Sequence, residues 1–187
     1  MRIETINKLI KVMDIASKDV TRTSIQYVLI ERVGLESELI TLTATNGHIM
    51  VNQTALDPKI ASILDDRGIL IHIDDIKKLK ALKIKRINNF SNDNTLWVIN
   101  DFRITIVKNT GIYPAYRQII PNFSGKTTQK LCFNAEYLEM LQATLLETKS
   151  GYIELEWDSN QTMGPIRVKT DLFSQSFGVL MPCKPLK

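Results

Sequence analysis

The stretch Ala44-Thr45-Asn46-Gly47-His48-Ile49-Met50 forms the centre of a strand–turn–strand pattern. Threonines alternate with apolar residues over residues 38–45, which is the period-two pattern of a half-buried strand. Asn46-Gly47 is a dipeptide that favours a tight hairpin turn with positive φ. The sequence therefore predicts a hairpin whose second strand covers residues 48–54.

Around this hairpin the chain repeats a unit of one helix followed by strands, with a period near 60 residues. In the first unit, Ile6, Leu9, Ile10 and Met13 have the spacing of one helical face, and a further strand is predicted over residues 24–32. In the second unit, a strand over 69–73 precedes a helix capped by Asp74 and extending to about residue 83. Strands over 95–99 and 102–108 follow it.

The third unit begins after a polar link at residues 124–129. A short strand is predicted over 131–133, and Asn134 is expected to cap a helix that extends to about residue 146. Strands are predicted over 151–158, 165–170 and 176–181. Between the second and third units, residues 111–121 contain two prolines and are expected to be extended. The pattern predicts an α+β protein in which the units must pair to cover their sheets, and three is an odd number of units.

Composition limits the class of protein. The chain has 187 residues, of which 44% are hydrophobic, enough for a substantial core, and it has no apolar run long enough to span a membrane. The first eight residues lack the apolar segment of a signal peptide, so the cytoplasm is the expected location. Cys132 and Cys183 lack metal-ligand spacing and are expected to pack, without a disulfide. No cofactor or metal is expected.

Catalytic signals are weak throughout. Gly125-Lys126-Thr127 lacks the upstream glycine of a phosphate-binding loop. The sequential acids 65–66 and 74–75 suit turns and helix caps better than acid–base chemistry. His48 and His72 have no cysteine or acid at ligand spacing. The chain is therefore not expected to be an enzyme.

The formal net charge is +4, and the whole excess lies within residues 1–118. Six basic residues crowd into positions 77–86 with no acid among them. Such a run is commonly a solvated helix face, but it also suits a surface that faces phosphates.

Three segments together resemble the bacterial DNA polymerase III beta subunit, the sliding clamp. Residues 44–50 are similar to that family's Ala-Thr-Asp-Gly-His-Arg-Leu turn, and residues 113–121 to the Phe-Pro-Asp-Tyr-Arg-Arg-Val-Leu-Pro segment that ends its second domain. Residues 133–138 resemble a Phe-Asn-x-x-Tyr-Leu helix start, and residues 179–184 the Val-Met-Pro-Met-Arg-Leu tail. The resemblance implies the DNA clamp fold in a shortened form of about one and a half domains per chain. Residues 1–121 would form a complete domain of two units, and residues 122–187 a half domain.

The resemblance also implies two functional surfaces. The first is a hydrophobic pocket for peptides of DNA polymerases and clamp loaders, lined by Thr45, Gly47, His48, Ile49, Met50, Pro114, Gln118, Ile119, Val179, Leu180, Met181 and Pro182. Flexible methionines there would adapt to several partners. Ile49 and Gln118 replace basic residues of the family, so altered partner specificity is expected.

The second surface is the inner wall of a ring, where helices would contact double-stranded DNA without reading its sequence. Its candidate residues are Lys8, Lys11, Lys18, Arg22, Lys77, Lys78, Lys80, Lys83 and Arg86. The third helix carries Glu136 and Glu139, so either these acids face away from the pore or that sector contributes little positive field.

The function expected from the resemblance is that of a processivity factor in DNA replication, shortened as a bacteriophage or mobile element might encode it. Rings of this fold contain twelve units, so three units per chain predict a homo-oligomer of four chains. Loading would depend on a separate ATP-driven loader. The alternative is a clamp-like interaction protein that has kept the pocket without the ring and acts as a decoy or adaptor for clamp-binding peptides.

Overall fold

The computed structural model describes residues 1–34, 36–83, 90–92, 95–99, 101–120, 132–145, 153–158, 160–161, 163–170 and 175–183, with only the backbone described for 90–92. The helices are α1 (Ile3–Met13), α2 (Pro58–Ala61), α3 (Ile73–Ala81) and α4 (Ala135–Leu145), with short 3-10 turns η1 (Thr23–Ile25) and η2 (Tyr116–Ile119). The strands are β1 (Tyr27–Arg32), β2 (Leu39–Thr45), β3 (Ile49–Leu56), β4 (Ile69–His72), β5 (Phe90–Asn92), β6 (Leu96–Ile99), β7 (Phe102–Thr105), β8 (Val107–Lys108), β9 (Glu154–Glu156), β10 (Ile166–Lys169) and β11 (Phe177–Leu180).

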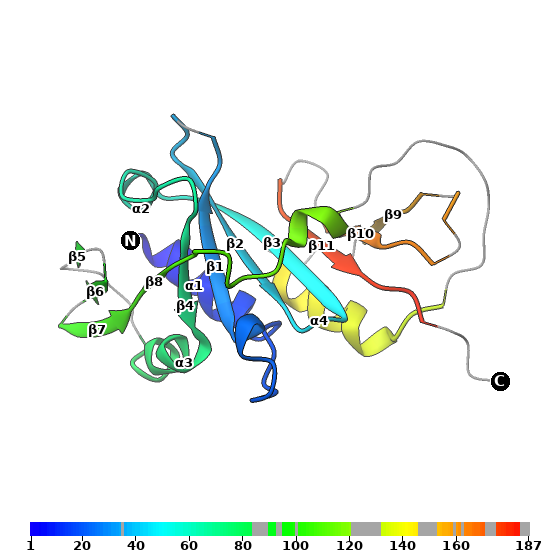
Figure 1. Ribbon diagram of the computed structural model, residues 1–187, viewed down its shortest axis with the longest axis horizontal. Coiled ribbons are helices and arrows are strands. Elements are labelled where there is room, and N and C mark those ends of the chain that lie inside the picture. The colour runs from blue at the N-terminus through cyan, green and yellow to red at the C-terminus, as the bar shows by residue number, and fades with distance from the viewer. Residues whose placement is uncertain are drawn as a thin grey trace.

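Eight strands form one antiparallel sheet in the order β8-β4-β1-β2-β3-β11-β10-β9. The predicted hairpin joins β2 to β3, and β3 pairs in turn with β11, so the first and third units share a continuous sheet (Figure 1). A second sheet has the order β5-β6-β7. The predicted strand over 102–108 is therefore divided, because β7 pairs with β6 while β8 pairs with β4.

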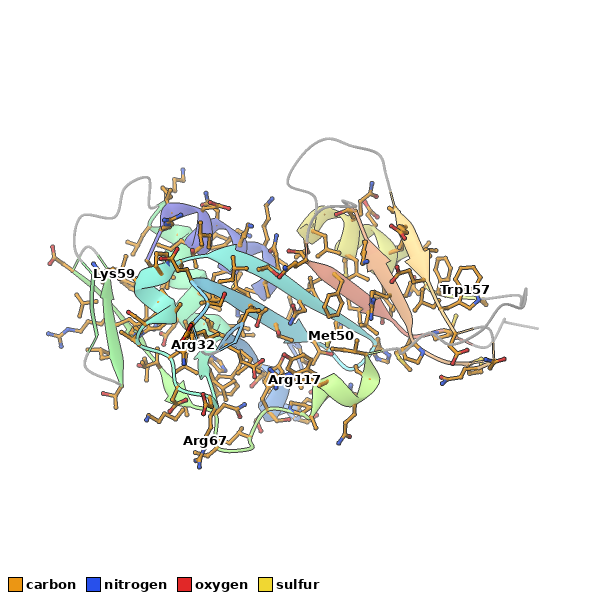
Figure 2. The ribbon with its side chains drawn as sticks, turned by 90° about the horizontal axis from the view of Figure 1, so that it is seen from above. Arg32, Met50, Lys59, Arg67, Arg117 and Trp157 are labelled. Atoms are coloured by element: carbon orange, nitrogen blue, oxygen red, sulfur yellow. The ribbon has the colours of Figure 1, made fainter. Side chains whose placement is uncertain are left out.

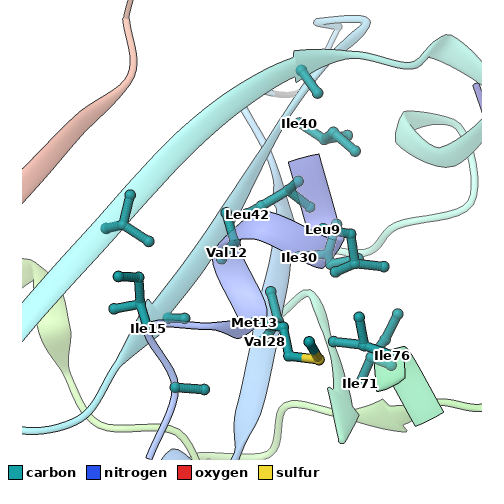
Figure 3. Packing of buried hydrophobic residues seen from close by; sticks show 14 of the residues in the cluster. Leu9, Val12, Met13, Ile15, Val28, Ile30, Ile40, Leu42, Ile71 and Ile76 are labelled. Carbon is teal, nitrogen blue, oxygen red and sulfur yellow. The ribbon is translucent and has the colours of Figure 1, made fainter. Parts of the chain in front are cut away.

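Helices cover one face of the eight-stranded sheet. Leu9 and Val12 of α1 are fully buried and pack between Ile30 and Leu42 of the sheet and Ile76 of α3 (Figure 3). Side chains of α4 join the same cluster, and α1 contacts both α3 and α4. Each fully buried leucine or isoleucine stabilises the fold by about 1.5–3 kcal/mol. The helical stripe predicted from the sequence is thus the central layer of the core.

The opposite face of the sheet carries a smaller apolar cluster. Tyr113 and Tyr116 pack there on Met50, Leu70 and Val179. This contact folds part of the segment predicted to be extended, since η2 occupies Tyr116–Ile119. That prediction is wrong because the tyrosines bury their rings against the sheet, an interaction with distant residues.

The structure differs from the sequence predictions at the start of α3 and in the segment before α4. The N-cap of α3 is His72, whose Nδ1 accepts from the Asp74 N–H at 3.2 Å, because the helix begins directly after β4. Cys132 and Phe133 are not in a strand, and residue 131 lies outside the described residues. Asn134 does precede α4 as predicted, and its side chain accepts from the Glu136 N–H at 2.9 Å.

The short helix α2 was not predicted, although its sequence contains recognisable signals. Pro58 stands at its first position, and the side chain of Asp57 accepts from the Ile60 N–H at 3.2 Å. The same buried carboxylate accepts from the Arg2 N–H and the Thr5 hydroxyl, each at 2.8 Å. Asp57 therefore joins the start of α1 to the end of β3.

Replacing Asp57 with alanine is expected to lower the free energy of unfolding by about 3 kcal/mol, because three donors lose a buried charged acceptor. Asp57→Asn should cost less, since its amide oxygen still accepts. Urea denaturation measures both, with the exposed Asp66→Ala as the control. An Asp57→Ala protein as stable as this control would contradict the assigned role.

Candidate functional site

The hairpin turn between β2 and β3 is held by its own side chains. The Asn46 Oδ1 accepts from the backbone N–H groups of His48 and Ile49 at 2.9 and 3.0 Å. The Thr45 hydroxyl donates to the Ile49 carbonyl at 2.7 Å and accepts from the Gly47 N–H at 3.1 Å. Gly47 has a φ of +89°, where a side chain would be strained. The sequence therefore fixes the shape of this turn locally.

The turn meets two segments from the end of the chain. The His48 ring stacks on Tyr137 of α4, with ring centroids 5.6 Å apart and an interplanar angle of 17°. The Met181 N–H donates to the His48 carbonyl at 3.2 Å, directly after β11. The structure thus brings together residues that the sequence separates by about 90 to 130 positions.

Five of the predicted pocket residues are buried in the protein itself, among them Thr45, which is 7% exposed and holds the turn. Ile49 and Leu180 are at most 2% exposed and face the helices, while Met50 and Val179 are at most 1% exposed and face the other cluster. The pairing of Met50 with Val179 places both under Tyr116. Treating Met50 as an adaptable surface group was therefore wrong, because strand pairing makes it part of the core.

The remaining predicted residues form a surface rim. Because the segment from Tyr113 packs over Met50 and Val179, its outward-facing residues lie above the junction of β3 and β11. Ile119 and Met181 are 39% and 36% exposed. The other exposed or half-exposed members are Gly47, His48, Pro114, Gln118 and Pro182.

An open hollow of about 560 Å³ lies along the same strands, on the face away from the helices. Its lining includes Asn52, Ile120, Phe177, Arg117 and Arg167. The sequence analysis did not single out these residues. Strand alternation would have identified two of them. Asn52 follows Met50 by two positions and Phe177 precedes Val179 by two positions, so each lies on the same face of the sheet as that buried residue.

A buried carboxylate fixes the segment that borders this hollow. Glu31 on β1 accepts from the Tyr116 hydroxyl at 2.6 Å and from Arg117 Nη2 at 3.2 Å. Burial, followed by the Glu31 hydrogen bond, raises the pKa of Tyr116 to about 12. The Tyr113 hydroxyl donates to the Thr43 carbonyl at 3.3 Å. Both tyrosines therefore stay neutral and anchor η2 to the sheet. Figure 2 labels Arg117, which belongs to η2, and Met50, which belongs to β3.

The two cysteines lie next to one another at the far end of the rim. Their sulfur atoms are 3.7 Å apart, and the Cys183 N–H donates to the Cys132 carbonyl at 2.7 Å. The thiol contact with Cys183 raises the pKa of Cys132. Cys183 is exposed, so the prediction that it packs in the interior is wrong. Cys183 is exposed because residues 181–183 extend beyond the end of β11.

Mild oxidation is expected to join these thiols within one chain, since small side-chain rotations bring the sulfurs to bonding distance. Diamide would accept the two electrons and two protons that the thiols lose. Titration of free thiols should fall from two to none, and the intact mass should fall by about 2 Da. Disulfide-linked dimers as the main product would contradict this pairing. The Cys183→Ser variant should keep its single thiol.

The lysines of α3 lie on exposed positions, but acids offset part of their charge. Lys77 Nζ is 2.7 Å from Asp74, and Lys78 Nζ is 2.8 Å from Asp75. The hydrogen bond with Asp75 raises the pKa of Lys78. Lys80 has a looser contact, 3.8 Å from Asp14.

Lys83 is also exposed and adopts a φ of +46° just past the end of α3. The predicted candidate Arg86 lies outside the described residues. The positive charge that faces solvent from α3 is therefore smaller than the lysine run suggested.

The basic residues of the first unit divide into different positions. The Lys8 side chain is only 12% exposed, and its amine donates to the Thr54 carbonyl at 2.9 Å and contacts Glu4. Lys11 and Lys18 are exposed. Arg22 lies beside the hairpin turn, 3.3 Å from the Asn46 carbonyl. Lys8 is thus engaged inside the protein, while the others point to solvent.

The exposed face of α4 is acidic. Leu141 and Leu145 are buried against the sheet, and Glu136 and Glu139 lie on the solvent-exposed side of the helix. Of the two alternatives left open by the sequence, exposure favours a sector with little positive field.

Three helices on one face of a continuous antiparallel sheet are also the arrangement of known solved structures. The DNA polymerase III beta chain from Streptococcus pneumoniae superimposes with a TM-score of 0.74 at 14% identity, over 99% of this chain and 64% of that one. This is the sliding clamp fold. The Caulobacter crescentus beta sliding clamp gives a TM-score of 0.74 at 16% identity, over 96% of this chain and 64% of that one. The Thermotoga maritima beta subunit gives 0.73 at 13%, over 98% and 64%.

These comparisons confirm the predicted clamp fold, and the chain spans less than two thirds of the length of each of these clamp chains. No protein-family model matches the sequence, and no curated protein is significantly similar to it. The described helices are all too short or too polar to cross a membrane.

Proposed function

We propose that this chain is a sliding clamp, a processivity factor that encircles double-stranded DNA and docks replication proteins at the rim formed by η2, the β2–β3 turn and the end of β11. The observation that supports this most directly is the placement of α1, α3 and α4 on one face of a sheet that continues from the first unit into the third. A curved wall built this way presents helices to the duplex and strands to the outside.

In this proposal the phosphate-facing residues are those that combine exposure with positive charge on the helical face. They are Lys11, Lys18, Arg22, Lys77, Lys78, Lys80 and Lys83, to which the sequence adds Arg86. Such contacts hold DNA without reading bases and so permit sliding. Little contribution is expected from Lys8, because its side chain is only 12% exposed and its amine donates to the Thr54 carbonyl.

The docking rim would receive apolar peptide segments of a polymerase or clamp loader. One bacterial clamp, from Bartonella birtlesii, is known bound to griselimycin, and one from Borrelia burgdorferi in complex with a natural product. Here Ile119 and Met181 offer apolar contact surface beside the stiff Pro114 and Pro182. Preformed rigid edges lower the ordering cost of binding. The protein itself supplies no chemistry in this role.

The proposed ring has four chains, with residues 1–121 as a complete domain and residues 122–187 as half of another. Light scattering after size-exclusion chromatography tests this directly. Four chains of 21.3 kDa give a mass of about 85 kDa for a closed symmetric ring. A monodisperse monomer at micromolar concentration would overturn the ring proposal.

A second function is favoured by the weakness of the positive field. Asp74 and Asp75 pair with two lysines of α3, and α4 exposes Glu136 and Glu139. A clamp-like decoy or adaptor would need only the rim and would bind clamp-binding peptides without encircling DNA. Retention on circular DNA separates the two functions.

A further inference from the structure

The two sides of the eight-stranded sheet follow the same pattern outward from the junction of β3 and β11, but one side has two more strands. On one side the order is β3-β2-β1-β4-β8, and on the other it is β11-β10-β9. Residues Tyr27–Ile30 of β1 pair with residues of β4 along their whole length. Among the described residues, β9 pairs only with β10, so no described strand occupies the edge that corresponds to the paired edge of β1.

In the first domain, β4 is the strand that pairs with the corresponding edge of β1. β4 immediately precedes α3, and its last residue, His72, caps that helix. In the third unit, Asn134 caps α4 in the same way, by accepting from the N–H two residues on. Counting back from the two caps aligns Cys132 with Leu70.

A second observation supports this alignment. Leu70 pairs on its other side with Val107 of β8, the strand at the end of its own unit. Cys132 likewise accepts a backbone hydrogen bond from Cys183, after the last strand of its own unit. The segment that begins at Cys132 thus has one edge engaged within its unit, as β4 does. In the first domain, the other edge of β4 binds the first strand of a different unit.

The apolar residues next to this edge of β9 are incompletely covered. Val28 and Ile30 of β1 are fully buried, whereas Leu155 and Trp157 on or beside β9 are only partly buried. The same contrast holds for Met140 of α4 against the fully buried residues of α1. The shielded Trp157 indole N–H has no acceptor among the described residues. Figure 2 places Trp157 at the extremity of the molecule opposite Lys59.

We propose that a second copy of this chain covers this edge: its segment beginning at Cys132 pairs with β9, and the reciprocal pairing forms at the same time. The contact is isologous, so two half domains complete one clamp domain around a twofold axis. This inference rests on the clamp proposal and identifies which residues join two of its chains. The partly buried residues Leu155, Trp157 and Met140 then become part of the core of the composite domain.

Cysteine cross-linking tests the pairing. Leu70 pairs with Leu29 on the face away from the helices, and the β9 residues on that face are Glu154 and Glu156, which flank Leu155. In a Cys183→Ser background, Glu154→Cys or Glu156→Cys should form an interchain disulfide with Cys132. More than half of the protein should then migrate as a dimer on a non-reducing gel for one of the two positions. Val20→Cys, on a site that is 77% exposed outside this edge, is the control.

The outcomes separate this inference from the function. No cross-link at either position in a protein that light scattering shows to be assembled would overturn the β9 contact and leave the clamp proposal standing. A cross-linked dimer that is never retained on circular DNA would support the contact and overturn the ring function. Trp157→Glu gives an independent measurement, since it should halve the assembled mass while Val20→Glu leaves the mass unchanged. Circular dichroism confirms that each variant is folded.

Discussion

Reversing the charge of Lys77, Lys78, Lys80 and Lys83 to glutamate should abolish retention of the protein on a nicked circular plasmid. Each lysine that faces a phosphate releases counterions on binding, and a reversed charge adds repulsion, so the loss should be at least about 1,000-fold at 0.1 M salt. Asp74 and Asp75 lose their lysine partners in this variant and would add to the repulsion. The measurement is co-elution of the protein with plasmid before and after linearisation.

A matched variant controls for total charge. Lys59, Arg67, Arg103 and Lys108 are four cations outside α1 and α3, and Arg103 faces away from the buried Ile104. Reversing these four changes the net charge equally but should leave retention within about threefold, because screening weakens charges more than about 10 Å from the duplex. Equal losses for the two variants would mean that net charge, and not the helical face, governs binding. Unchanged retention of the α3 variant would contradict the inner-wall assignment.

Met181→Ala combined with Ile119→Ala should weaken partner binding at the rim by about 2–4 kcal/mol, a loss of at least 30-fold in Kd. These two side chains carry most of the apolar surface that the rim exposes, and neither is part of the core. Griselimycin, which binds the clamp of Bartonella birtlesii, is a suitable probe, and isothermal titration calorimetry gives its Kd.

Met163→Ala is the control for the rim, since Met163 is 48% exposed on the loop before β10. It should leave griselimycin binding unchanged. If Met163→Ala weakens binding as much as the double variant, the rim is not the docking site. If the unmodified protein does not bind the probe while it is retained on DNA, the pocket has diverged at Ile49 and Gln118 beyond use by that ligand.

Local patterns in the sequence were sufficient for most elements. The spacing of Ile6, Leu9 and Met13 predicted α1, and the Asn46-Gly47 pair predicted the turn that the structure shows. Both rest on interactions within a few residues, where side-chain periodicity and turn chemistry dominate. The short helix α2 also had a local signal, in Asp57 and Pro58, that was not recognised.

The same distinction between local and distant interactions applies to the candidate site. The sequence, through its resemblance to the clamps, grouped the hairpin turn with the end of the chain, and the hydrogen bond from the Met181 N–H to the His48 carbonyl places these two segments side by side. It could not separate Met50 and Val179 from Met181, because all three look like apolar strand residues. Only the pairing of β3 with β11 and the tyrosines above it decide which side chain is buried.

The sequence by itself determined that this protein has three helix-plus-strand units, a hairpin of fixed shape and an uneven distribution of positive charge. Those properties depend on neighbours close in the chain. The tertiary structure alone decided that Lys8 is engaged internally, that Cys132 and Cys183 touch, and that β9 has only β10 as a partner among the described residues. The first two depend on contacts between residues more than 40 positions apart, whose formation is governed by the packing of the whole sheet and not by any local preference.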